Sequence, residues 1–140
     1  MSNVLERNRE FSELEFFVNA IAIRAELVRY LRSAKIPKRA YWTYSVRGIE
    51  YAMNLMSELV AANSIYPTDE AELEQRRFHQ NNAIVACEQI VEHIHFMVET
   101  LDTVSIDDFK ILGDMLFKEV NLIKKWRSKN KVLTQKYEIT

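Results

Sequence analysis

Apolar residues recur every three or four positions through four long stretches of the chain, and short polar or proline-containing segments separate these stretches. This spacing predicts amphipathic helices over about residues 12–32, 38–62, 70–101 and 106–127. Each predicted helix carries apolar residues on more than one side. Because a helix that is apolar on two sides requires cover on two sides, the pattern favours a bundle whose outer faces also meet other chains.

The first two predicted helices show this double pattern most clearly. Within residues 12–32, one seam comprises Leu14, Phe17, Val18, Ile21, Ala25 and Val28, and a second seam comprises Phe16, Ala20, Ile23, Leu27 and Tyr30. Within residues 38–62, a heptad seam comprises Trp42, Val46, Ile49, Met53, Met56 and Val60, beside Tyr41, Tyr44, Tyr51, Leu55 and Leu59. We expect an interface between chains to use Phe16, Ile23, Leu27, Tyr30, Tyr41 and Tyr44.

Capping and breaking residues agree with these limits. Three pairs match the capping-box spacing at helix starts, namely Ser12 with Glu15, Asp69 with Glu72, and Ser105 with Asp108. Pro37 cannot continue the first helix, and Pro67 lies in the next break. Gly48 falls inside the second helix, where it costs about 1 kcal/mol relative to alanine and therefore indicates a close approach of another helix.

The composition supports an all-α fold. With only two glycines and two prolines in 140 residues, the chain lacks the frequent turn signals of a β protein. The short connections predict an antiparallel up-down-up-down four-helix bundle over residues 11–127, after an extension at 1–10 and before a lysine-rich tail at 128–140. The start of the chain is charged, and no 18-residue apolar run occurs, so we expect a soluble cytoplasmic protein without membrane contact.

Charge is unevenly distributed although the net charge is only −1. Residues 24–47 carry +6 and residues 109–140 carry +5, whereas residues 48–108 carry −10. The first basic cluster contains Arg29, Arg32, Lys35, Lys38, Arg39 and Arg47, interleaved with Tyr30, Tyr41, Trp42 and Tyr44. The second contains Lys124, Lys125, Arg127, Lys129, Lys131 and Lys136.

Both clusters are candidate phosphate-binding surfaces, and we take Arg29, Arg32, Lys35, Lys38, Arg39, Arg47, Lys124, Lys125 and Arg127 as candidate nucleic-acid contacts. The alternative is that these cations only decorate helix ends, where the helix dipole favours positive charge. For the interleaved aromatic residues, we expect burial in the core.

No pattern in the chain predicts catalysis or a cofactor. Glu92 and His95 match half of a di-iron ligand set, but all three histidines fall in one predicted helix, which argues against a metal site and favours solvated side chains. Cys87 lies in the apolar register, as expected for a buried thiol. Glu88 and Glu92, one turn apart, are common on helix surfaces, and two glycines cannot form a phosphate loop. We therefore expect a protein that is not an enzyme.

Four strings carry a family resemblance: Glu13-Leu-Glu-Phe-Phe17, Ala62-Asn-Ser-Ile-Tyr-Pro67, Arg76-Arg77 and Ala83-Ile84. With them, residues 11–127 resemble the bacterial four-helix-bundle proteins related to ribosomal-RNA intervening-sequence proteins. That family includes the accessory variability proteins of diversity-generating retroelements, which form pentameric barrels and bind a reverse transcriptase and nucleic acid. Those accessory proteins tend to be strongly basic, whereas this chain is nearly neutral.

The resemblance implies a homo-pentamer that acts as a non-catalytic accessory protein. Its implied partners are a reverse transcriptase and the structured RNA, or other nucleic acid, of the element. A protein-only helical scaffold is the alternative, in which the acidic third helix docks on a basic partner and no nucleic acid is bound.

Overall fold

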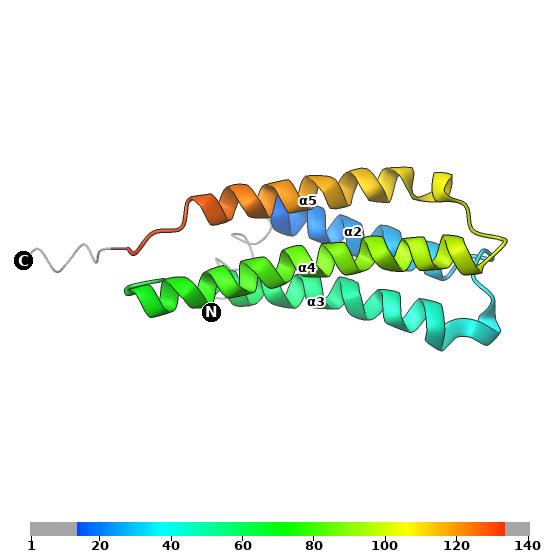
Figure 1. Cartoon of the computed structure of the whole chain (residues 1–140), viewed down its shortest axis with the longest axis horizontal. Coiled ribbons are helices and arrows are strands. Elements are labelled where there is room, and N and C mark those ends of the chain that lie inside the picture. Colours follow the sequence, from blue (N-terminus) through cyan, green and yellow to red (C-terminus); the bar gives the residue numbers. More distant parts are fainter. Residues whose placement is uncertain (1–13, 134–140) are drawn as a thin grey trace, which may run out of the picture.

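The computed structural model describes residues 14–133 and contains four long helices in that range. They are α2 (Glu15–Leu31), α3 (Arg47–Asn63), α4 (Glu70–Thr100) and α5 (Lys110–Ser128), labelled in Figure 1. Short helices precede two of them: a 3-10 turn η1 (Lys38–Ala40), a π-helix η2 (Trp42–Val46) and a 3-10 turn η3 (Ile106–Phe109). The predicted all-α four-helix bundle is confirmed. The extension at 1–10, the Ser12 cap and Lys136 lie outside the described residues.

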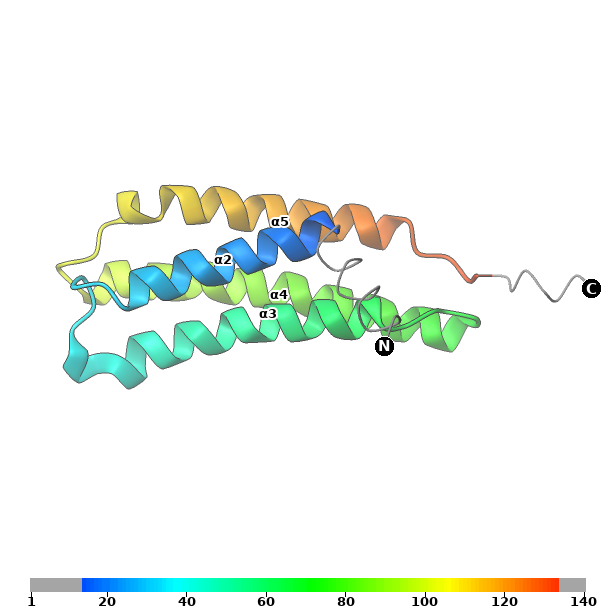
Figure 2. The same cartoon turned by 180° about the vertical axis from the view of Figure 1, so that it is seen from behind.

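Hydrogen bonds between helices show which parts of the bundle lie side by side. Tyr44 in η2, just before α3, donates from its hydroxyl to Thr100 Oγ1 at the end of α4, 2.9 Å away. Asn19 near the start of α2 reaches Glu119 in the second half of α5. Figures 1 and 2 show the α2–α3 and α4–α5 connections at one end of the bundle and the α3–α4 connection at the other.

The predicted caps of the last two helices are present. Asp69 Oδ1 accepts a hydrogen bond from the backbone N–H of Glu72 at 2.8 Å. Ser105 and Asp108 form a reciprocal capping box at the start of η3. These bonds satisfy backbone donors that the first helical turn leaves free, so both helices begin where the local sequence indicates.

The face that α2 turns to the core differs from the prediction. Phe16, Ile23 and Leu27 are buried within the chain, whereas Val18 and Ile21 of the other seam are 48% and 46% exposed. Assigning Phe16, Ile23 and Leu27 to an interface between chains was therefore wrong, because these residues are buried in the core of their own bundle, where α2 packs against α3 and α5. The exposed seam is the one that remains available to another chain.

The face of α3 shows the same reversal. Leu55 and Leu59 are buried, while Met53 and Val60 of the predicted heptad seam are exposed. Tyr44, predicted at an interface, is also buried. Two further candidates differ from it: Tyr30 is partly buried and Tyr41 lies on the surface.

Candidate nucleic-acid interface

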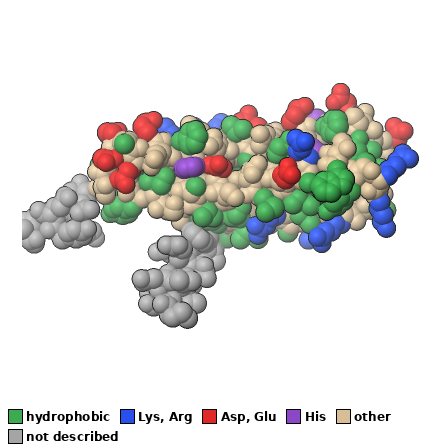
Figure 3. Space-filling model, turned by 90° about the horizontal axis from the view of Figure 1, so that it is seen from below, with side chains coloured by type: hydrophobic (Ala, Val, Ile, Leu, Met, Phe, Trp, Pro, Cys, Tyr) green, Lys and Arg blue, Asp and Glu red, His purple; other side chains and the backbone are tan. Residues whose placement is uncertain are grey.

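The first basic cluster lies around the α2–α3 connection. Arg29 pairs with Glu26 on its own helix, and Lys35 Nζ lies 3.5 Å from Asp108 Oδ2. The other four cations are exposed, and within residues 14–133 no carboxylate forms an ion pair with them: Arg32, Lys38, Arg39 and Arg47. This end of the bundle, which we call the basic end, thus presents four positive charges without neutralising partners among the described residues. Figure 3 shows Lys and Arg side chains gathered towards it.

Two aromatic residues stand on the same surface. The side chains of Trp42 and Tyr41 are 78% and 50% exposed, with ring centroids 6.1 Å apart in an edge-on arrangement. For these two residues the expected burial in the core was wrong. The reason is local, because residues 38–46 form a 3-10 turn and a π-helix whose side-chain spacing does not follow the 3.6-residue period of α3. Tyr44 in the same segment is buried, as expected.

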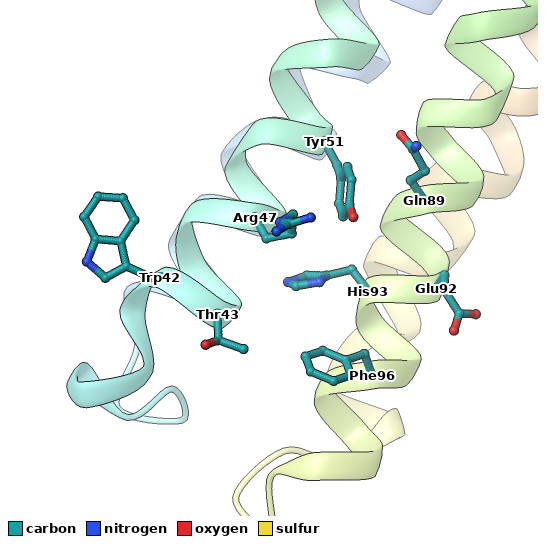
Figure 4. A pocket seen from close by; sticks show the side chains of 8 residues that line it. All are labelled: Trp42, Thr43, Arg47, Tyr51, Gln89, Glu92, His93 and Phe96. Carbon is teal, nitrogen blue, oxygen red and sulfur yellow. The ribbon is translucent and has the colours of Figure 1, made fainter.

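Beside this surface, an open cleft of about 560 Å³ lies between η2, the first turns of α3 and the last part of α4. Its lining residues are Trp42, Thr43, Arg47, Tyr51, Gln89, Glu92, His93 and Phe96. In Figure 4 the guanidinium of Arg47 points between Tyr51 and His93, whereas the carboxylate of Glu92 points away from it. The cleft therefore combines one inward cation with the rings of Trp42, Tyr51, His93 and Phe96.

The contact between Gly48 and His93 gives the cleft its inner wall. A Cβ atom on Gly48 would lie 2.8 Å from Leu31 Cδ1 and 3.2 Å from His93 Cδ2, so a side chain at this position would crowd both residues. This agrees with the predicted close approach at Gly48. His93 Nε2 is 2.8 Å from the carbonyl oxygen of Tyr44. Because a carbonyl only accepts, Nε2 carries the proton and fixes the ring orientation.

His93 is the main error of the histidine predictions. It was expected among solvated flank residues, but it is buried, and its ring packs edge-on against Tyr51 at a centroid distance of 5.7 Å. Burial lowers the pKa of His93, the hydrogen bond to Tyr44 opposes this shift, and the charge of Arg47 adds to it. The imidazole is therefore neutral at pH 7. Phe96, with its ring centroid 6.1 Å from that of His93, completes the row of rings.

The second basic cluster lies at the C-terminal end of α5, away from the basic end. Lys124 and Lys125 are exposed, while Arg127 is partly buried and donates from Nη1 to Asn81 Oδ1 at 2.7 Å. Since α5 has 19 residues, its two ends are roughly 28 Å apart. One chain therefore does not bring the two clusters together, and a single nucleic-acid site would have to use one of them.

Among the described residues, the side chains considered for metal binding and catalysis do not come together in one site. Glu92 Oε2 lies 3.9 Å from His95 Nδ1, but within residues 14–133 no group of three His, Cys, Asp or Glu side chains is arranged to hold a metal ion. Cys87 is buried as predicted, and burial raises the pKa of its thiol to about 12, which leaves it protonated.

Apolar side chains also remain on the outside of all four helices. The largest are Val18 and Ile21 on α2, Met53 and Val60 on α3, Phe78, Val85, Val91 and Phe96 on α4, and Ile111 and Phe117 on α5. Figure 3 shows such side chains spread along one face of the molecule. An open groove of about 520 Å³ between α4 and α5 is lined by Val91, Leu116, Phe117 and Val120, with Glu88 and Glu92 at its border.

Comparison with known proteins adds no independent guide to function. No family model, curated protein sequence or solved structure matches this chain. Among the described helices, none is both long and apolar enough to cross a membrane. The basic end and the cleft beside it are the features of the molecule that bear on its function.

Proposed function

We propose that this protein is a non-catalytic accessory subunit that binds structured RNA, or other nucleic acid, together with a reverse transcriptase. The observation that carries the proposal is the exposure of Trp42 and Tyr41 beside four cations that lack ion-pair partners within residues 14–133. An exposed tryptophan has no role in the core of its own chain. Next to cations, it supports stacking on unpaired bases while the cations contact phosphates.

The expected binding energies favour a site that combines base stacking with phosphate contacts over a site that has only one of them. Stacking of a base on an aromatic side chain contributes about 1–3 kcal/mol, and it is tolerant of sequence. Each neutralised phosphate of a single strand adds a salt-dependent gain with a slope of about −0.7 in log affinity against log salt. Four cations and two rings on one subunit are therefore enough for weak binding. Repetition of the site around an oligomer would raise the overall affinity.

A homo-oligomer is part of the proposal, and the family resemblance suggests a pentamer. The exposed apolar residues of α2 and α3 support it, because apolar surface that the bundle leaves uncovered favours association. The reverse transcriptase as the protein partner is proposed from the resemblance alone. In that role the oligomer would hold RNA while the partner performs the chemistry.

A protein-only scaffold is the second candidate function, and the α4–α5 groove favours it. The groove is mainly apolar, and its carboxylates Glu88 and Glu92 suit an amphipathic helix with basic flanks. A scaffold of this kind would bind its partner without using Trp42 or the basic end.

RNA binding distinguishes the two candidates. Binding of a fluorescent single-stranded 12-mer and of a structured RNA hairpin is measured by anisotropy from about 50 to 300 mM salt. We expect Arg32→Ala/Lys38→Ala to weaken binding and to reduce the salt slope by about 1.4, from about 0.7 for each phosphate contact. Arg77→Ala/Lys118→Ala removes the same charge away from the basic end, at cations paired with Glu74 and Glu15, and serves as the control.

Two outcomes would overturn RNA binding as the function. One is no binding of either RNA at about 50 mM salt, where the electrostatic contribution is strongest. The other is an equal loss of affinity in the two double variants, because the effect would then follow net charge and not the basic end. Co-purification of the protein with a reverse transcriptase from its host tests the partner separately.

A further inference from the structure

We propose that the cleft between α3 and α4 binds one unpaired guanine base. The proposal rests on RNA binding at the basic end and adds a site that selects one base. The size of the cleft, its rings and the orientation of Arg47 lead to it.

The size and lining of the cleft suit a flat heterocycle. A volume of about 560 Å³ falls within the range of about 300–1,000 Å³ that is usual for small-molecule sites. Tyr51, His93 and Phe96 supply ring surfaces from α3 and α4, and Phe96 is 36% exposed, so part of its ring is open to a ligand. His93 is neutral at pH 7, because burial lowers its pKa, and it therefore presents a ring without adding a charge.

Arg47 is the residue from which we infer a preference of the cleft for guanine. Its guanidinium points into the space between Tyr51 and His93, and Glu92, which shares the cleft wall, points elsewhere (Figure 4). Arginine has several donors in a planar fork and no acceptor. Guanine presents two adjacent acceptors, O6 and N7, which match that fork in a bidentate contact.

On the edge that corresponds to O6 and N7 of guanine, the other bases fit this fork less well. Adenine and cytosine place an amino group, which is a donor, where the guanidinium also donates, and uracil offers a single carbonyl oxygen on the corresponding edge. Gln89, on the α4 side of the cleft, can both donate and accept, so it does not oppose guanine. Arg32, Lys38 and Arg39 lie outside the cleft, where they can contact phosphates, so Arg47 is available to contact the base.

The position of the cleft connects it to the surface that holds the strand. Trp42 belongs both to the cleft border and to the exposed aromatic surface, and it precedes Arg47 by five residues through the π-helix η2. π-helical turns are rare in proteins, but those that occur often lie at functional sites. A strand that stacks on Trp42 would therefore have its next unpaired base within reach of the cleft.

The test compares three 12-nucleotide RNAs: all uridine, all uridine with one central guanosine, and all uridine with one central adenosine. Affinities are measured by anisotropy at one salt concentration. One guanosine should strengthen binding at least fivefold over uridine alone, which corresponds to the lower limit of a good bidentate contact, about 1 kcal/mol. One adenosine should give a smaller gain.

Variants separate base recognition from charge. Arg47→Lys keeps the charge and removes the fork, so it should abolish the guanosine preference. Phe96→Ala should reduce the preference through lost stacking. Arg77→Lys, at an exposed cation paired with Glu74, is the control and should change neither property. Thermal unfolding monitored by circular dichroism verifies that each variant is folded.

Each outcome assigns success or failure to one of the two proposals. If all three RNAs fail to bind at about 50 mM salt, RNA binding and the guanine site are both refuted. If the RNAs bind equally well, or if adenosine is preferred, the guanine site is refuted while RNA binding stands. A guanosine preference that survives Arg47→Lys also refutes the assignment of the base to this cleft.

Discussion

The buried carboxyl group of Glu119 makes the stability of the bundle depend on pH. Glu119 lies on α5 and is completely buried; its Oε1 accepts a hydrogen bond from Asn19 Nδ2 at 2.9 Å, and Oε2 has no hydrogen-bond partner among the described residues. Burial raises the pKa of Glu119 to about 8, although the bond from Asn19 and the charge of Lys118 favour the ionised form. The folded protein therefore holds this carboxyl protonated at pH 7.

The direction of the pH effect follows from the two states. The ordinary pKa of glutamate is 4.5, so between pH 4.5 and about pH 8 the folded state binds one more proton than the unfolded state. The stabilising contribution is fully present below pH 4.5 and is lost as the pH rises through about 8. Each pH unit in this window lowers the free energy of unfolding by about 1.4 kcal/mol. From pH 5 to pH 7.5 the loss amounts to about 3 kcal/mol.

Urea unfolding of the wild type and of Glu119→Gln measures this loss. Glutamine keeps an oxygen acceptor for Asn19 but cannot ionise, so raising the pH from 5 to 7.5 should shift the stability difference by about 3 kcal/mol in favour of the variant. Glu88→Gln, at an exposed carboxyl on α4, is the control and should run parallel to the wild type. A difference between wild type and Glu119→Gln that stays constant across this range would refute the reasoning.

Two other predictions concern packing. Gly48→Ala should destabilise the protein by about 1 kcal/mol, because overpacking against Leu31 costs about 1–3 kcal/mol and the gain in helix propensity offsets only part of that cost. Gly113→Ala, which has open space around it, should stabilise the protein by up to about 1 kcal/mol. Thermal unfolding measures both variants, and the reversed order of stability would contradict this prediction. Ile21→Glu should dissociate the proposed oligomer in native mass spectrometry while preserving the helical signal, whereas Leu27→Glu should unfold the chain. An unchanged mass for Ile21→Glu would exclude this face as the interface.

Local signals explain the parts of the fold that the sequence predicts. The helix starts at Asp69 and Ser105 depend on side chains that bond backbone groups two or three residues away, so neighbouring residues are sufficient to locate them. The apolar period likewise locates α3 and α4, because one side of each helix has to be buried. These features need no information about other parts of the chain.

The choice between two apolar seams is a different problem. On α2, the seam with Ile23 and the seam with Ile21 have similar apolar character, and only the positions of α3 and α5 decide which is buried. Periodicity also fails in η2, since a π-helix shifts the spacing and turns Trp42 outward. Sequence reasoning therefore located the first basic cluster, but it assigned the buried residues of α2 to an interface between chains and Trp42 to the core.

Sequence reasoning missed the cleft because its two sides, residues 42–51 and 89–96, lie far apart in the chain. It did single out Gly48, which packs against the inner wall of the cleft. Gly48 lacks a Cβ atom, so His93 can approach α3 and donate to the carbonyl of Tyr44 within the π-helix. That bond fixes the imidazole as one wall of the cleft, beside Arg47. A larger residue at position 48 would crowd Leu31 and His93 and so strain the hydrogen bond from His93 to Tyr44 in η2. The packing of one glycine thus links the stability of the basic end to the shape of the proposed base-binding site.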